Sequence, residues 1–191
     1  MTRLGIMIRA LAVVAILVLF TYPPEASAGW EEIDHILTQA YGAKAARECR
    51  EYVRSLKIPE EHLDTLQESI GRLVEADYPK GCPREYLKLA AQLARAGISP
   101  ADLTNKIREG IAKRVDADRL VHVLGKRAEA LKEGRALVLG LERENIRFLD
   151  RQMAYTVMAD YLLRGVKSSD LTTSVIAGQM GKYPALRNVI H

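Results

Sequence analysis

The stretch Gly97–Leu103 has the sequence Gly-Ile-Ser-Pro-Ala-Asp-Leu, and the stretch Gly165–Leu171 has the sequence Gly-Val-Lys-Ser-Ser-Asp-Leu. Each begins with a glycine, which is suited to the left-handed turn that ends a helix. A β-branched residue follows, and five positions later comes a leucine, the spacing of a hydrophobic staple across a helix start. The aspartate then falls at the third helical position, where it faces the helix dipole. The pattern predicts a helix-turn-helix unit in both places.

The staple spacing occurs twice more, at Ile58 with Leu63 and at Val115 with Leu120. The four helix starts are separated by 40, 17 and 51 residues. A tetratricopeptide array would repeat at a fixed period of about 34 residues, so this irregular spacing argues against a regular solenoid. We expect a compact bundle assembled from helical hairpins, with a short irregular helical-repeat scaffold as the alternative architecture.

The rest of the chain also has a helical pattern. It contains no sustained alternation of apolar and polar residues and no hairpin dipeptide between β-rich runs. We therefore predict an all-α fold of about six to seven helices. The expected helices span residues 31–56, 60–76, 83–96, 100–114, 117–132, 142–164 and 168–180. The spacing of Leu131 and Val138 also allows the fifth helix to continue past Gly134, although a glycine there weakens it.

The N-terminus has the pattern of a secretory signal peptide. Arg3 and Arg9 precede an apolar run over residues 10–20, and Ala26-Ser27-Ala28 fits a cleavage site. The run of 11 residues is too short to span a bilayer, which takes roughly 20. The pattern predicts cleavage after Ala28 and export of residues 29–191, as one all-α domain, to the periplasm or the extracellular space.

The two cysteines, Cys49 and Cys82, both belong to the part of the chain that we expect to be exported. An oxidising compartment favours a disulfide between them. They are 33 residues apart, whereas thioredoxin-like chemistry needs a Cys-x-x-Cys turn. We therefore predict one structural disulfide, Cys49–Cys82.

The composition excludes several classes of protein. With 48% hydrophobic and 27% charged residues, the chain is neither low-complexity nor collagen-like, and two cysteines cannot form a four-cysteine zinc site. The charge is unevenly distributed. Residues 29–79 carry six basic and 11 acidic side chains, whereas residues 80–191 carry 20 basic and 12 acidic ones. This asymmetry suits contact with a charged partner.

No complete catalytic or cofactor motif is present. The common hydrolase, metalloprotease, nucleotide and c-type haem signatures are missing. His35 has a glutamate three positions before it, but a di-iron site needs a second such pair. Glu68-Ser69 matches two residues of a lytic transglycosylase motif without its accompanying motifs, and Met153 with Met158 is more typical of core packing than of haem ligation. We predict no catalytic residue, no metal and no cofactor.

Eleven lysines and arginines lie between residues 106 and 147, a stretch without aromatic residues. Six of them form the candidate binding face: Lys113, Arg114, Lys126, Arg127, Lys132 and Arg135. The aromatic side chains that would stack on bases are absent from this stretch, so we expect no nucleic-acid partner. We expect a non-catalytic binding or adaptor protein that contacts anionic lipid headgroups, acidic polysaccharide or another envelope protein. The alternative is an exported enzyme of unrecognised type.

Overall fold

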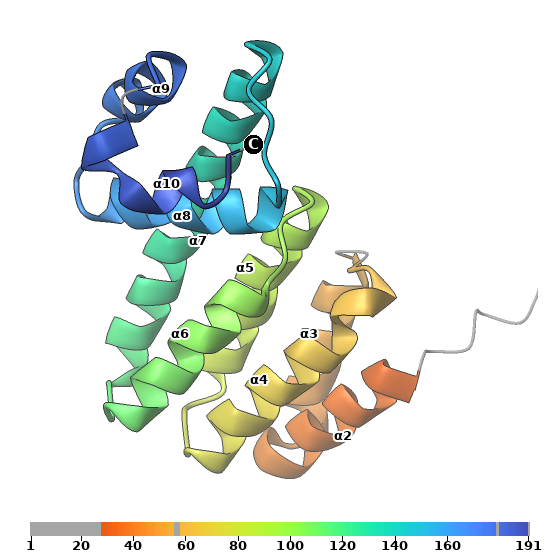
Figure 1. The fold of residues 1–191 in the computed structure, drawn as a ribbon. Helices are drawn as coiled ribbons and strands as arrows, with labels where there is room; N and C mark the ends of the chain where they lie inside the picture. Colours follow the sequence, from red (N-terminus) through yellow and green to blue (C-terminus); the bar gives the residue numbers. More distant parts are fainter. Residues whose placement is uncertain (1–27, 56–57, 179, 191) are drawn as a thin grey trace, which may run out of the picture.

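The computed structural model describes residues 28–55, 58–178 and 180–190, and these residues are helical apart from turns and one isolated bridge, Phe148–Ile190 (Figure 1). The predicted all-α fold is confirmed. The helices are α2 (Ala28–Tyr41), α3 (Ala43–Ser55), α4 (Leu63–Glu75), α5 (Gly81–Arg95), α6 (Ala101–Ala112), α7 (Ala117–Arg143), α8 (Arg151–Leu163), α9 (Ser168–Ile176) and α10 (Pro184–Arg187), with 3₁₀ turns at Glu60–His62 and Met180–Lys182. Residues 1–27 lie outside the described residues, so the signal peptide stays a prediction.

The helices are stacked in two layers. In one layer α4 packs between α2 and α6, and in the other α5 packs between α3 and α7. Helix α7 runs beyond this stack, and its second half packs against α8 at the end of the molecule that also holds α9 and α10 (Figure 1). The molecule is thus assembled from helical hairpins, as expected. The stacking of successive helices in each layer also resembles the helical-repeat alternative.

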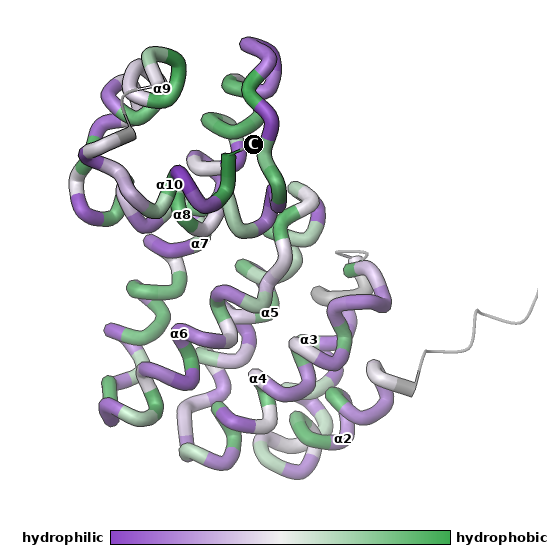
Figure 2. Tube along the Cα trace, in the orientation of Figure 1, coloured by the Kyte–Doolittle hydropathy of each residue, from purple (hydrophilic) through white to green (hydrophobic). Residues whose placement is uncertain are grey.

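Apolar side chains from both layers meet in one continuous core. Leu66 and Ile70 of α4, Leu103 and Ile107 of α6, and Leu124 of α7 are all fully buried. Hydrophobic and hydrophilic residues alternate along most helices, as expected for helices that bury one face and leave the other in water (Figure 2). Burial of each such side chain stabilises the fold by about 1.5 to 3 kcal/mol before the cost of ordering the chain.

Both predicted helix-turn-helix units are present. Gly97 and Gly165 have φ angles of +68° and +84°, in the left-handed region that favours glycine. The amides of the next residues, Ile98 and Val166, donate back to carbonyl oxygens five residues earlier, at 2.9 and 3.1 Å. This is the Schellman arrangement, and it satisfies carbonyl groups that the helix end would otherwise leave unpaired.

Three other helices end in the same way without a glycine. Asp77, Arg114 and Asn145 have φ angles of 57°, 52° and 64°, and each precedes a residue whose amide closes the turn. A left-handed conformation costs a residue with a Cβ roughly 1 to 2 kcal/mol, so these turns are held by the packing of the apolar residues that follow them. The turn closed by Arg114 joins α6 to α7.

The expected helix over residues 31–56 is wrong. Gly42 has a φ of +83° and separates α2 from α3, which then fold back against each other as a hairpin. Gly42 is the only glycine between residues 31 and 56, and its left-handed conformation ends α2. This break raises the number of helices above the predicted six to seven.

Two boundaries near the middle of the chain also differ from the prediction. The helix expected over residues 117–132 continues past Gly134 to Arg143, the longer of the two extents that the sequence allows. Gly134 lies at a close crossing, since a Cβ there would lie 2.7 Å from the carbonyl oxygen of Tyr155. The helix expected over residues 142–164 begins only at Arg151. Asp150 caps it by accepting a hydrogen bond from the Met153 amide at 3.0 Å.

Candidate functional site

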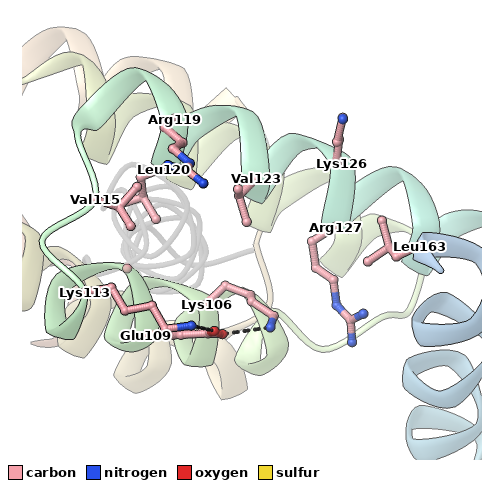
Figure 3. A pocket seen from close by; sticks show the side chains of 11 residues that line it. Lys106, Glu109, Lys113, Val115, Arg119, Leu120, Val123, Lys126, Arg127 and Leu163 are labelled. Carbon is pink, nitrogen blue, oxygen red and sulfur yellow. Dashed lines mark hydrogen bonds and ion pairs between the residues drawn. The ribbon is translucent and has the colours of Figure 1, made fainter.

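A cleft of about 350 Å³ lies between α6 and α7, in the region where the sequence concentrates positive charge (Figure 3). We call it the basic cleft. Its lining combines charged side chains with apolar ones from three helices and the turn that joins α6 to α7. The lining residues are Lys106, Glu109, Gly110, Lys113, Val115, Arg119, Leu120, Val123, Lys126, Arg127 and Leu163.

The α6 side of the basic cleft carries a trio of charges. Lys106 and Lys113 donate to the two oxygens of Glu109, at 2.9 and 2.5 Å. Hydrogen bonds from Lys106 and then Lys113 lower the pKa of Glu109 to about 2. Glu109 is therefore a permanent carboxylate at neutral pH, and the trio has one positive charge in excess.

The α7 side carries Arg119, a cation for which the described part of the chain offers no counter-charge. The backbone of Arg119 donates to the α7 cap, Asp116, at 2.9 Å, but within the described ranges its guanidinium has no ion-pair partner. Figure 3 shows the Arg119 side chain directed toward the space between α6 and α7, whereas Lys126 points away from that space. Among the described residues that line the basic cleft, Arg119 is thus a cation that faces the interior and has no ion-pair partner.

Arg127 was predicted to lie on the binding face, but the structure places it in the interior. Its side chain is only 4% exposed and forms a bidentate pair with Asp102, at 2.6 and 2.7 Å, and a third contact with Asp160 at 2.5 Å. Burial alone would lower the pKa of Arg127, but the hydrogen bonds and charge of Asp102 and then Asp160 outweigh it and raise the pKa. Arg127 therefore joins α6, α7 and α8 and is not available to a partner.

The other predicted face residues are dispersed. Lys113 and Lys126 line the basic cleft, but Arg114, Lys132 and Arg135 do not. Lys132 pairs with Glu129 at 2.5 Å. Lys106 and Arg119 were missing from the predicted face, although both belong to the same basic stretch; the phase of each helix relative to the turn could have placed them on the inner side.

No protein-family model, curated protein or solved structure matches this chain. Among the helices that the structure describes, none combines the length with the apolar character needed to cross a bilayer.

The two cysteines lie on neighbouring helices of one layer. Cys49 is on α3 and Cys82 is near the start of α5, and both are buried free thiols. The predicted disulfide is not formed in this structure. Burial raises the pKa of Cys82 to about 11, and it also raises the pKa of Cys49, against the opposing charge of Arg84. Neither thiol is activated as a nucleophile, which needs a lowered pKa.

The structure also shows the surroundings of the other residues that the sequence singles out: Glu68, His35, Met153 and Met158. Hydrogen bonds from Arg108 and then Arg72 lower the pKa of Glu68, the opposite of what a general acid requires. His35 is exposed, and the described part of the chain contains no group of three His, Cys, Asp or Glu side chains placed to hold a metal. Met158 is fully buried in the core, whereas Met153 is exposed.

A shallower depression borders the basic cleft along α7 and contains His122, Glu129 and Glu133. Both of its carboxylates have partners: Glu129 accepts from Lys132, and Glu133 accepts from the Ser168 hydroxyl. These two carboxylates thus stabilise α7 and its contact with α9. The basic cleft is the better candidate site.

Proposed function

We propose that this chain is an exported, non-catalytic binding protein that takes an anionic group of its partner into the basic cleft. The observation that carries this proposal is the unpaired Arg119 guanidinium facing a cleft whose opposite wall also has an excess positive charge. A carboxylate or phosphate there would gain charge-assisted hydrogen bonds, which are about twice as strong as neutral ones. Such a ligand would supply the counter-charge that the described residues do not.

The lining of the basic cleft favours binding over catalysis. Its one carboxylate, Glu109, is held by two lysines with a pKa of about 2, and no histidine is among its lining residues. General acid-base catalysis needs a group that exchanges protons near the working pH. The cleft offers fixed charges instead, so the enzyme alternative finds no support in it.

The class of partner follows from the proposed export. Arg3 and Arg9 before the apolar run, and Ala26-Ser27-Ala28 after it, support removal of residues 1–28. Anionic lipid headgroups are one class of anionic group that an exported envelope protein would meet, and each lysine or arginine near an anionic lipid surface contributes about 1 kcal/mol. Acidic polysaccharides and envelope proteins present the same chemistry and can be tested with the same variants.

Vesicle binding tests the proposal. The purified protein should bind phosphatidylglycerol vesicles and not phosphatidylcholine vesicles, in a co-sedimentation assay at low salt. Binding should weaken steeply as salt is added, because screening shortens electrostatic reach to about 8 Å at physiological ionic strength. Equal binding to the neutral vesicles, or binding that salt does not weaken, would contradict the proposal.

Neutralising variants locate the contact. Arg119→Gln should weaken binding to phosphatidylglycerol vesicles about fivefold, the loss expected for one cation near the surface. Arg114→Gln and Arg135→Gln are the matched controls, because both belong to the basic stretch but neither lines the cleft. Equal losses in all three variants would indicate a diffuse basic surface. Arg127 is left unchanged, because removing its charge would disturb a buried ion pair.

We also propose that the exported protein carries the Cys49–Cys82 disulfide. Both thiols are buried on helices that pack together, and an oxidising compartment would favour their union. In the chain-entropy model a loop of this length contributes about 3 to 4 kcal/mol. Alkylation under denaturing conditions without reductant, followed by intact-mass measurement, should add no label to protein collected from the exported fraction. Two added labels would rule the disulfide out.

A further inference from the structure

The basic cleft has an apolar side as well as a charged one. Val123 of α7 and Leu163 of α8 both line it, and they are 38% and 47% exposed. They are two of the five large hydrophobic side chains that are exposed in the described part of the chain. Single exposed hydrophobic residues are common on protein surfaces, but these two come from different helices and give one cavity an apolar lining.

Two further apolar residues line the cleft. Val115 and Leu120 lie at the end near the turn between α6 and α7 (Figure 3). Gly110 keeps the two helices close at this point, since a Cβ there would lie 2.7 Å from Cδ1 of Leu120. The volume of about 350 Å³ falls in the range of small-molecule sites and is too small to take up a folded partner.

We propose that the basic cleft binds a single-chain anionic amphiphile, of the class of a long-chain carboxylate. Its headgroup would meet Arg119, and its alkyl chain would cover Val123 and Leu163. This inference rests on the proposed function and names its ligand class. A small inorganic anion would leave the apolar lining in water, and an uncharged hydrocarbon would leave Arg119 without a counter-charge. An amphiphile satisfies both sides of the cleft.

Chain length provides the first test. The affinities of the purified protein for octanoate, decanoate and dodecanoate are measured by isothermal titration calorimetry, below the concentrations at which these acids form micelles. If the alkyl chain enters the cleft, affinity should rise about threefold to fourfold per methylene group, until the cavity is filled. Dodecyltrimethylammonium, which has the same chain and the opposite charge, should bind at least tenfold more weakly than dodecanoate.

Two tryptophan variants separate the apolar contact from general surface hydrophobicity. Val123→Trp should fill the cleft without changing its charge, and it should weaken dodecanoate binding at least tenfold and abolish the dependence on chain length. Ile176→Trp is the matched control, because Ile176 on α9 is 53% exposed and does not line the cleft. Its binding should match that of the unchanged protein. Circular dichroism melts verify that both variants fold.

Arg119→Gln tests the headgroup contact. It should weaken the binding of all three acids by the same factor, so that the increment per methylene stays unchanged. Should Val123→Trp itself fail to fold, Val123→Asp places a repelling charge at the same position with a smaller side chain. Retention of the chain-length dependence in the folded Val123 variant would overturn the inference.

The possible outcomes distinguish this inference from the proposed function. If affinity does not depend on chain length, or if the cationic amphiphile binds as well as the acid, the amphiphile inference is wrong. The proposed function would still hold as long as vesicle binding weakened with salt and with Arg119→Gln. If the acids do not bind and vesicle binding is also independent of salt and of Arg119, both proposals fall together.

Discussion

The turn between α5 and α6 and the turn between α8 and α9 share one sequence pattern but have different energetic roles. Each closes on a left-handed glycine, and each places an aspartate in the first turn of the next helix. Asp102 accepts two hydrogen bonds from the buried Arg127 and one from Thr156 at 3.2 Å. Asp170, its counterpart, is exposed and accepts only from the neighbouring Ser169 among the described residues.

The neighbours of the two units explain this difference. Helix α6 lies between α4 and α7, whereas α9 packs mainly against α7. The first turn is also held from outside by Gln152 of α8, which donates to the Gly97 carbonyl at 2.8 Å and accepts from the Ser99 amide at 3.0 Å. The same local motif therefore specifies the shape of a turn in both places, while its contribution to stability depends on what packs around it.

The largest difference in stability between the two units should come from replacing their aspartates. Asp102→Ala leaves the Arg127 guanidinium buried with only Asp160 as a partner, and should lower the free energy of unfolding by roughly 3 to 5 kcal/mol. Asp170→Ala should cost less than about 0.5 kcal/mol, because an exposed aspartate in a first turn acts mainly on the helix dipole. Urea unfolding curves measure both. Combining Asp102→Ala with Arg127→Met should recover part of the loss, since it removes a buried charge that keeps only one of its two carboxylate partners. Equal losses for Asp102→Ala and Asp170→Ala would contradict the different roles of the two turns.

Replacing the leucine of each helix-turn-helix unit should give two losses of stability that differ less than those of the aspartates. Leu103 and Leu171 are both fully buried. Leu103→Ala should cost about 2 to 4 kcal/mol, because the helices on either side of α6 hinder collapse of the cavity, and Leu171→Ala should fall near the lower end of that range. Thermal melts followed by circular dichroism give the order. A larger loss at Leu171 would indicate that α9 is held more firmly than its contacts suggest.

The smallest effect should be a gain in stability. Arg114 has a φ of 52° at the end of α6, in the position that Gly97 and Gly165 occupy at the ends of α5 and α8. Arg114→Gly should raise the free energy of unfolding by about 0.5 to 1 kcal/mol, since glycine adopts this conformation without strain. Gly97→Ala is the reverse change and should lower it by a similar amount. A loss on Arg114→Gly would show that the arginine side chain stabilises the turn through its own contacts.

The sequence predicts those features whose cause is local. Gly97 and Gly165 mark their turns because glycine favours the left-handed conformation and the residues that follow carry the staple spacing. Asp77, Arg114 and Asn145 form the same turn, but the sequence marks them less clearly, because their conformation is imposed by packing. The all-α class follows from periodicity, which is also local.

The candidate site was predicted only in part, because its geometry depends on contacts between distant residues. Arg127 and Lys126 are neighbours in a basic stretch, and nothing local indicates that one is buried and the other exposed. The difference arises because Asp102 and Asp160, 25 residues before and 33 residues after Arg127, converge on its guanidinium. The orientation of Arg119 toward the cleft likewise follows from the phase of α7, which is fixed by its cap at Asp116.

Helix α7 has 27 residues and is therefore about 40 Å long, and it serves both ends of the molecule. Its first half packs against α5 and α6, and its second half crosses α8 closely at Gly134. Local unfolding at the centre of α7 would remove a packing surface from the hairpin stack and from the C-terminal helices at the same time. The two ends should therefore lose structure in a single cooperative step, and the amide protons around Leu131 should exchange with solvent only when the whole chain unfolds.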